Sequence, residues 1–167
     1  MNRYLFFFII VLFIGCDKTE DNIFTQTPDE RLKATADEYR EALFSAPNGW
    51  FLAVDTKKDG AYRLWMSFEE NERVGMLSDM DATFSKAGET SVVPCISSWR
   101  LKALLAPSLI FDTYSYLHIL ADPQGANNGG SNSEGLISDF EFRIVDTDNG
   151  GINLIGNYNG RLARRNT

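Results

Sequence analysis

The segment WFLAVDTKKDGAYRLWMSF, residues 50–68, decides the fold because its apolar side chains recur at every second position. This alternation predicts two strands, over residues 50–56 and 61–68. Between them, residues 57–60 (Lys-Lys-Asp-Gly) have the composition of a turn. Strands joined this tightly pair antiparallel, because a parallel neighbour needs a crossover of a dozen or more residues. Residues 50–68 are therefore a predicted hairpin.

The same alternation continues downstream and predicts further strands at residues 72–78, 95–101, 109–113, 139–145, 152–156 and 161–163. Turn residues divide the last of these strands, at 146–151 and 157–160. Residues 114–121 fit either a strand continuation or a turn of helix, and 79–94 have no clear period and are predicted as a loop. Residues 122–133 are rich in Gly and Asn, so we expect a flexible segment there.

A helix is predicted upstream of the hairpin. Thr27 is suited to the N-cap, Pro28 to the first helical position, and Glu30 completes a capping box. An apolar stripe follows at helical spacing, formed by Leu32, Ala36, Tyr39 and Leu43. We expect an α+β fold in which this one helix packs on an antiparallel β-meander sheet, with a partial barrel as a variant. Residues 27–167 are long enough for a single domain and too short for two.

The first fifteen residues are typical of a secretory signal, because Arg3 precedes an apolar run over residues 4–14. The run is too short to span a bilayer, which needs about 20 apolar residues. Residues 12–16 (Leu-Phe-Ile-Gly-Cys) resemble the lipobox of bacterial lipoproteins, with Phe13 where the usual pattern has Leu. We therefore predict a signal peptide at 1–15. The alternative is a plain secretory signal. Residues 14–16 fit the small-residue cleavage pattern of such a signal less well.

Acylation of Cys16 is the predicted consequence, with a polar lipid tether over residues 16–26. Each methylene of the acyl chains buried in the bilayer contributes about 0.8 kcal/mol, so several chains make a stable anchor. The expected location is the outer membrane, on either its periplasmic or its surface face.

Charge and cysteine content narrow the possible partners. The 167-residue chain has 16 basic and 23 acidic residues, a formal charge of −7, and losing Arg3 with the signal makes it −8. This sign argues against nucleic acid and against attraction to anionic lipid, so the membrane is reached through the lipid anchor. Cys95 has no partner once Cys16 carries lipid, which excludes a disulfide framework and favours a small core residue.

The sequence offers few residues that could act in catalysis or bind a metal or a phosphate. His118 is the only histidine, and a Ser-His-Asp arrangement would use it with Ser115 and Asp112, but no nucleophile elbow accompanies them. One histidine and one free cysteine cannot supply the ligands of a zinc site. Residues 146–151 lack the twelfth-position Glu of a calcium loop, and Gly129-Gly130 lack the lysine of a phosphate loop. We predict no catalytic residue, no metal and no cofactor.

Aromatic side chains are the most suggestive feature of the sequence. Sugar rings stack on exposed aromatic faces, whereas strands and cores also favour aromatic residues, so core packing is the preferred interpretation of any single ring. The candidate ligand-binding residues on or beside predicted strands are Trp50, Trp65, Trp99, Tyr114 and Tyr116.

Three stretches carry a family resemblance: residues 45–50 (SAPNGW), residues 109–114 (LIFDTY) with Leu117 and His118, and residues 139–142 (DFEF). They resemble the N-terminal part of a family of Bacteroidetes lipoproteins of unknown function, the domain of unknown function family 4302. The resemblance implies a longer protein, of which this chain would be a truncated form, and genes beside those of outer-membrane nutrient-uptake proteins. It assigns no catalytic residues. The short strand predicted at 161–163, which ends the chain without a predicted neighbour, also favours truncation.

The leading hypothesis is a non-enzymatic lipoprotein that serves a nutrient-uptake or surface-binding system, with an uptake complex or a glycan as its partner. One alternative is a carrier or sensor that holds an apolar ligand in a curved sheet. The other is an envelope hydrolase with paired carboxylates, for which Asp112 and Glu141 are the candidate pair.

Overall fold

The structure is a computed structural model that describes residues 26–80, 94–103, 106–148 and 151–164. The expected signal peptide, Cys16, nearly all of the tether and most of the loop expected at 79–94 lie outside these residues. The described elements are α2 (Pro28–Phe44), β1 (Trp50–Asp55), β2 (Ala61–Phe68), β3 (Arg73–Ser78), β4 (Cys95–Ala103), β5 (Pro107–Phe111), α3 (Tyr116–Ala121), α4 (Gly125–Asn128), β6 (Glu141–Asp148), β7 (Gly151–Gly156) and β8 (Leu162–Arg164).

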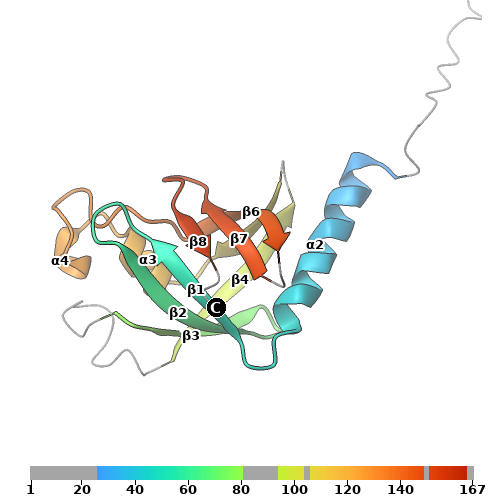
Figure 1. The fold of residues 1–167 in the computed structure, drawn as a ribbon, viewed down its shortest axis with the longest axis horizontal. Helices are drawn as coiled ribbons and strands as arrows, with labels where there is room; N and C mark the ends of the chain where they lie inside the picture. The colour runs from blue at the N-terminus through green and yellow to red at the C-terminus, as the bar shows by residue number, and fades with distance from the viewer. Residues whose placement is uncertain (1–25, 81–93, 104–105, 149–150, 165–167) are drawn as a thin grey trace, which may run out of the picture.

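The eight strands form a closed antiparallel barrel in which every strand pairs with its neighbours in sequence (Figure 1). β8 closes the barrel, because Ala163 stands opposite Val54 of β1 and also opposite Leu154 of β7. The predicted meander is confirmed, but the sheet is a full barrel. The expectation that the last strand lacks a neighbour is wrong.

The predicted hairpin of residues 50–68 is confirmed. β1 and β2 pair from Trp50 opposite Met66 to Asp55 opposite Ala61. At the turn, the backbone N–H of Thr56 donates to the carbonyl of Gly60 at 2.7 Å. Gly60 has a φ of +72°, a conformation that glycine adopts without steric cost.

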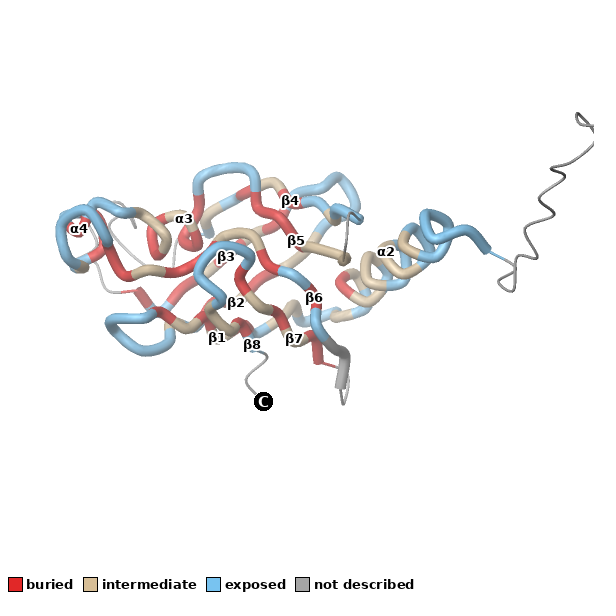
Figure 2. Tube along the Cα trace, turned by 90° about the horizontal axis from the view of Figure 1, so that it is seen from above, coloured by how far each residue is buried: buried red, intermediate tan, exposed pale blue. Residues whose placement is uncertain are grey.

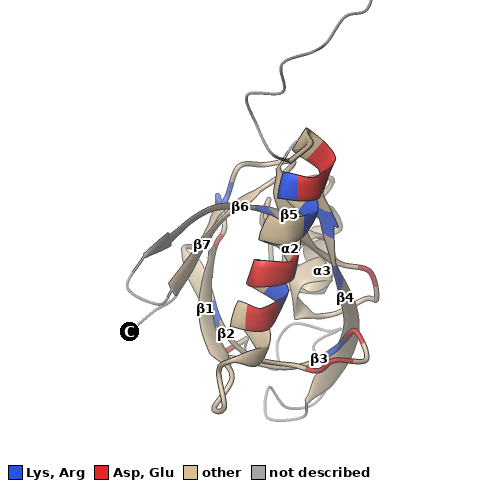
Figure 3. Ribbon diagram, turned by 90° about the vertical axis from the view of Figure 1, so that its right-hand side faces the viewer, with Lys and Arg blue, Asp and Glu red and all other residues tan. Residues whose placement is uncertain are grey.

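The helix start is confirmed as well. The backbone N–H of Glu30 donates to Thr27 Oγ1 at 3.3 Å, and the backbone N–H of Thr27 donates to the Glu30 carboxylate at 2.8 Å. However, α2 does not lie on a face of the sheet. Its C-terminal part lies at one mouth of the barrel against β4 and β5, and Leu43 is its only buried residue (Figures 2 and 3). None of the described helices is long and apolar enough to span a membrane.

The barrel interior is filled by its own side chains. Alternate strand residues point inward, as Leu52 and Val54 do in β1, and an eight-stranded barrel is just wide enough for such side chains to fill it. The largest of the fully buried side chains is Trp99, whose indole meets the ring of Phe68 edge-on at 5.1 Å. Because the inner face packs against itself, only a mouth is left for α2 to cover.

Candidate binding surface

The two mouths of the barrel differ in what covers them. The mouth at α2, here called the proximal mouth, has short described turns such as residues 69–72. The opposite or distal mouth receives the β1–β2 turn, the β7–β8 turn and a long connection over residues 112–140, which contains α3 and α4 (Figure 1). Long loops on a rigid scaffold are where binding residues concentrate, so the distal mouth is the candidate site.

The connection 112–140 plugs the distal mouth. Its apolar side chains join the barrel core, and the buried members are Tyr116, Leu117, Ile119, Leu120 and Leu136. Residues 114–121, which the sequence left undecided between strand and helix, contain the helix α3. The barrel is therefore packed at this end and does not form an open cup.

A small apolar cavity lies beside the C-terminal turn of α2. Its volume is about 30 Å³, and it is lined by Leu43, Trp50, Phe51, Leu52, Met66, Phe68, Leu109, Ile144, Ile152 and Leu154. This volume holds about one water molecule, whereas sites for small-molecule ligands measure about 300–1,000 Å³. A lipid or an aromatic compound does not fit in this cavity without movement of the core.

The segment expected to be flexible, residues 122–133, is held by specific bonds. The amide nitrogen of Asn128 donates to the carbonyls of Ile119 and Asp122, both at 2.9 Å, and its oxygen accepts the backbone N–H of Gly130 at 3.0 Å. The prediction of flexibility is corrected accordingly. Because the Gly130 N–H is already bonded to Asn128, it does not point to a phosphate.

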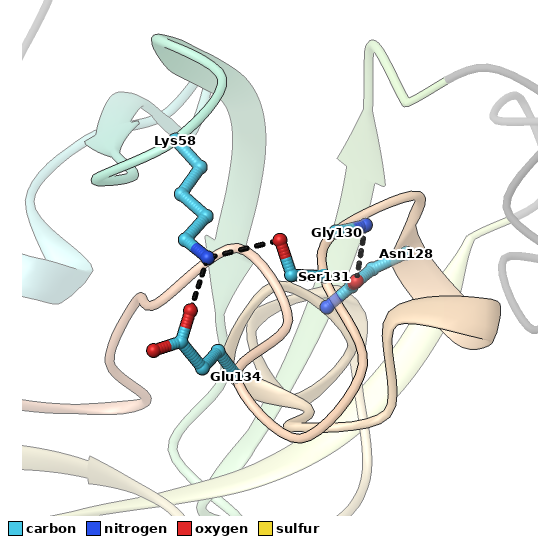
Figure 4. Close-up of polar contacts among 5 residues, drawn as sticks. All are labelled: Lys58, Asn128, Gly130, Ser131 and Glu134. Atoms are coloured by element: carbon cyan, nitrogen blue, oxygen red, sulfur yellow. Dashed lines mark hydrogen bonds and ion pairs between the residues drawn. The ribbon is translucent and has the colours of Figure 1, made fainter.

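Lys58, in the β1–β2 turn, bonds to this connection (Figure 4). Lys58 Nζ donates to Ser131 Oγ at 3.0 Å and forms an ion pair with the Glu134 carboxylate. The hydrogen bond from Lys58 lowers the pKa of Glu134 below its ordinary value. One residue earlier, the backbone N–H of Lys57 donates to the carbonyl of Leu136 at 3.1 Å. The long connection is thus bonded to the neighbouring hairpin through backbone and side chains.

A column of four aromatic rings lies on this end of the barrel. Tyr114 stacks on His118 with ring centroids 5.6 Å apart, and His118 stacks on Phe140 at 4.4 Å. Phe140 lies 6.4 Å from Tyr158 in the β7–β8 turn, with the planes 34° apart. The two inner rings are half-buried, whereas Tyr114 and Tyr158 at the ends are 48% and 71% exposed. The column therefore offers ring surface to solvent at its two ends.

His118 occupies a structural position in this column. Its Nδ1 lies 3.1 Å from Ser115 Oγ, but Ser115 is buried and so its hydroxyl is not accessible to a substrate. Asp112 accepts a hydrogen bond from Arg100 at 2.9 Å, in an exposed ion pair. The arrangement lacks the accessible nucleophile that a Ser-His-Asp triad requires.

Burial lowers the pKa of His118 from its ordinary value of 6.5, and Asp112 opposes this effect in part. The unfolded chain therefore binds a proton at a higher pH than the folded protein does. The contribution to stability is intact above pH 6.5 and is lost as the pH falls below that value. We predict that between about pH 7.5 and pH 5 the wild-type protein loses more unfolding free energy than the variant His118→Gln, measured by urea denaturation. Equal losses in the two proteins would contradict this role of His118.

A buried carboxylate holds the turn that carries Tyr158. Asp139 Oδ1 accepts the backbone N–H groups of Tyr158 at 3.0 Å and Asn159 at 2.8 Å, and Oδ2 accepts that of Arg161 at 3.2 Å. Gly156 makes room for this carboxylate, because a Cβ there would lie 2.0 Å from Asp139 Oδ2. The Asp139 carboxylate therefore holds the backbone of the β7–β8 turn at three points.

The predicted ligand-binding tryptophans are engaged in packing and in backbone bonds. Their indole N–H groups donate to main-chain carbonyls: Trp50 to Leu43 at 2.8 Å, Trp65 to Asn48 at 2.7 Å and Trp99 to Arg73 at 3.1 Å. Trp99 is 1% exposed, so it presents no ring face to a ligand and is corrected to a core residue. Trp50 and Trp65 are partly exposed.

The two tyrosines that were predicted to bind a ligand lie in different surroundings. Tyr116 is buried in the core and is corrected in the same way, whereas Tyr114 lies in the exposed aromatic column. Phe140 and Tyr158, the other members of the column beside His118, were not among the residues predicted from the sequence. A signal was present for Tyr158, since an aromatic residue is unusual in a turn otherwise made of Asn and Gly.

Residues 20–164 match the family described as a domain of unknown function, DUF4302. No curated protein and no solved structure matches the chain. The match spans well over half of the chain and confirms, at the level of the family, the resemblance carried by residues 45–50, by residues 109–114 with Leu117 and His118, and by residues 139–142. The protein therefore belongs to the DUF4302 family of domains of unknown function.

Proposed function

We propose that this protein is a lipid-anchored, non-enzymatic binding component of the cell envelope that serves a nutrient-uptake system in the outer membrane. The observation that carries the proposal is that the two ends of the barrel differ. The chain enters the domain at α2, at the proximal mouth, while its longest described connection and its exposed aromatic column lie at the distal mouth (Figure 1). A protein tethered through residues 16–26 would present the distal mouth away from its anchor.

The site chemistry supports binding in preference to catalysis. The hydroxyl beside the histidine belongs to the buried Ser115, and the carboxylate of Asp112 is ion-paired with Arg100. Within the described residues, no group of three or more His, Cys, Asp or Glu side chains is placed to hold a metal ion. The residues gathered at the distal mouth are suited to contact a ligand, and none of the described contacts activates a nucleophile.

The alternatives gain less support. A carrier of an apolar ligand needs an apolar cavity large enough to hold it, and the apolar cavity beside Leu43 and Trp50 has a volume of about 30 Å³. A hydrolase with paired carboxylates would use Asp112 and Glu141, and Asp112 is already engaged with Arg100.

The anchor is tested by labelling cells with radioactive palmitate. We expect label in the wild-type protein and in the variant Cys95→Ser, which is the matched control because it removes the other cysteine. The variant Cys16→Ser should carry no label and should leave the membrane fraction, because it lacks the acylated sulfur. Label in Cys16→Ser, or unchanged membrane association of that variant, would contradict the proposal.

The accessory role is tested by affinity capture of the lipidated protein from its own cells, with identification of the bound proteins, and by a glycan panel. We expect an outer-membrane uptake protein or a glycan to be retained by the wild-type protein. Retention of neither would remove the nutrient-uptake role and would leave the anchor to be judged by the palmitate label alone.

A further inference from the structure

Tyr158 is the most exposed of the large hydrophobic side chains in the described part of the chain, at 71%. It stands in the β7–β8 turn, where Asn157, Asn159 and Gly160 are its neighbours. Turns usually carry small polar residues or glycine, so a large ring at this position exposes apolar area that a turn does not need. Its position calls for an explanation beyond folding.

The backbone that carries the ring is held in place before any ligand arrives. Asp139 fixes the backbone of Tyr158 and of Asn159, and the Asn159 amide donates to the carbonyl of Ser138 at 2.7 Å. Phe140 lies beside the tyrosine ring at 6.4 Å and is itself stacked on His118. A turn whose backbone is already ordered in this way loses little conformational entropy when a ligand binds to it.

The surroundings of the ring are polar and open, and the side chain of Arg161 donates through Nε to the carbonyl of Asn159 at 3.1 Å. Asn157 is exposed, and its backbone N–H donates to the carbonyl of Glu141 at 2.9 Å, which fixes its place next to Tyr158. An asparagine amide can both donate to and accept from hydroxyl groups. At Gly160 a Cβ would meet nothing within 4 Å, so the space there is unobstructed.

From this geometry we propose that the β7–β8 turn is a carbohydrate-binding site, with one sugar ring stacked on Tyr158 and its hydroxyls bonded to Asn157. The inference rests on the proposed function and names the ligand class of its distal surface. A sugar has an apolar C–H face of about the size of one aromatic ring and a rim of hydroxyls, which matches a single ring flanked by an amide. A protein partner fits less well, because a stable interface buries about 800 Å² on each side and the tip of this turn is polar apart from Tyr158.

The test uses the full-length lipidated protein, purified in detergent, on a panel of immobilised neutral oligosaccharides and polysaccharides. We expect the wild-type protein to bind at least one glycan and the variant Tyr158→Ala to bind it at least about tenfold more weakly. Tyr158→Phe keeps the ring and should bind within about threefold of the wild type. The matched control is Phe51→Ala, which removes another half-exposed ring, on β1, and should leave binding unchanged.

The outcomes separate the inference from the function on which it rests. Wild-type protein that carries palmitate at Cys16 but binds no neutral glycan would overturn the carbohydrate site and leave the anchored function standing. Equal binding by Tyr158→Ala and wild type would also overturn it, as would capture of a protein partner that depends on Tyr158 in the absence of glycan binding. Loss of the palmitate label would overturn the proposed function whatever the panel shows. The urea midpoint of Tyr158→Ala should match that of the wild type, which shows that any loss of binding is not a loss of folding.

Discussion

Replacing Asp139 with alanine should lower the unfolding free energy by about 3 kcal/mol, because three backbone N–H groups lose a buried charged acceptor at once. Asp139 is 1% exposed, so water does not readily replace its carboxylate. The groups left without a partner belong to the turn that joins β7 to β8, the strand that closes the barrel. The measurement is urea denaturation of the full-length protein, with the midpoint and the slope compared to wild type.

Two further variants serve as comparisons for Asp139→Ala. Asp139→Asn keeps an oxygen for the N–H groups of Tyr158 and Asn159, but places an amide donor opposite the N–H of Arg161, so its loss of stability should be intermediate. Asp112→Ala removes an exposed carboxylate with one ion pair and should change the free energy by less than about 1 kcal/mol. If Asp139→Ala were no more damaging than Asp112→Ala, the carboxylate would not be what holds the turn.

The features predicted correctly from the sequence are local ones. The capping box joins Thr27 and Glu30, three residues apart, and the hairpin of residues 50–68 needs only a period of two and a turn. Such interactions are encoded in neighbouring residues and leave a visible pattern. The order of the strands that short turns join follows from them, because such turns force sequential antiparallel pairing.

Closure of the barrel was not predictable in the same way. It depends on Ala163 pairing with Val54, more than a hundred residues away, and on the twist and stagger that accumulate over eight strands. A three-residue strand, β8, gives little sequence signal of its own. The helix was misplaced for the same reason, since the sheet face on which it was expected to pack is the inside of the closed barrel.

The aromatic residues show a second limit of prediction from sequence alternation. Alternation assigns Trp65 and Leu64 to opposite faces of β2, but both faces of this barrel carry apolar side chains. Phe51 stands opposite Trp65 on the outer face and is half-exposed, while Leu52 and Leu64 form the matching inner pair. Period alone therefore separates the faces without saying which one is inside.

Composition was also misleading in the glycine-rich connection, where Gly135→Ala is expected to cost about 3 kcal/mol. Gly135 has a φ of +58°, and a Cβ there would lie 1.8 Å from the carbonyl oxygen of Asp122 and 2.9 Å from Asn128 Nδ2. Both partners belong to the bonded core of residues 122–133, so neither can move without breaking a hydrogen bond of Asn128. Urea denaturation of the full-length variant measures the loss.

Gly129→Ala is the matched control, because it separates backbone strain from close packing. Gly129 has a φ of +75°, as unfavourable for alanine as that of Gly135, but a Cβ there would meet nothing within 4 Å. Only the strain remains, and it should cost about 1 kcal/mol. The difference between the two variants therefore measures how tightly the connection is packed. Equal losses would mean that residues 122–133 yield to a new side chain, as a flexible segment does, and that glycine is required at Gly135 by its φ alone.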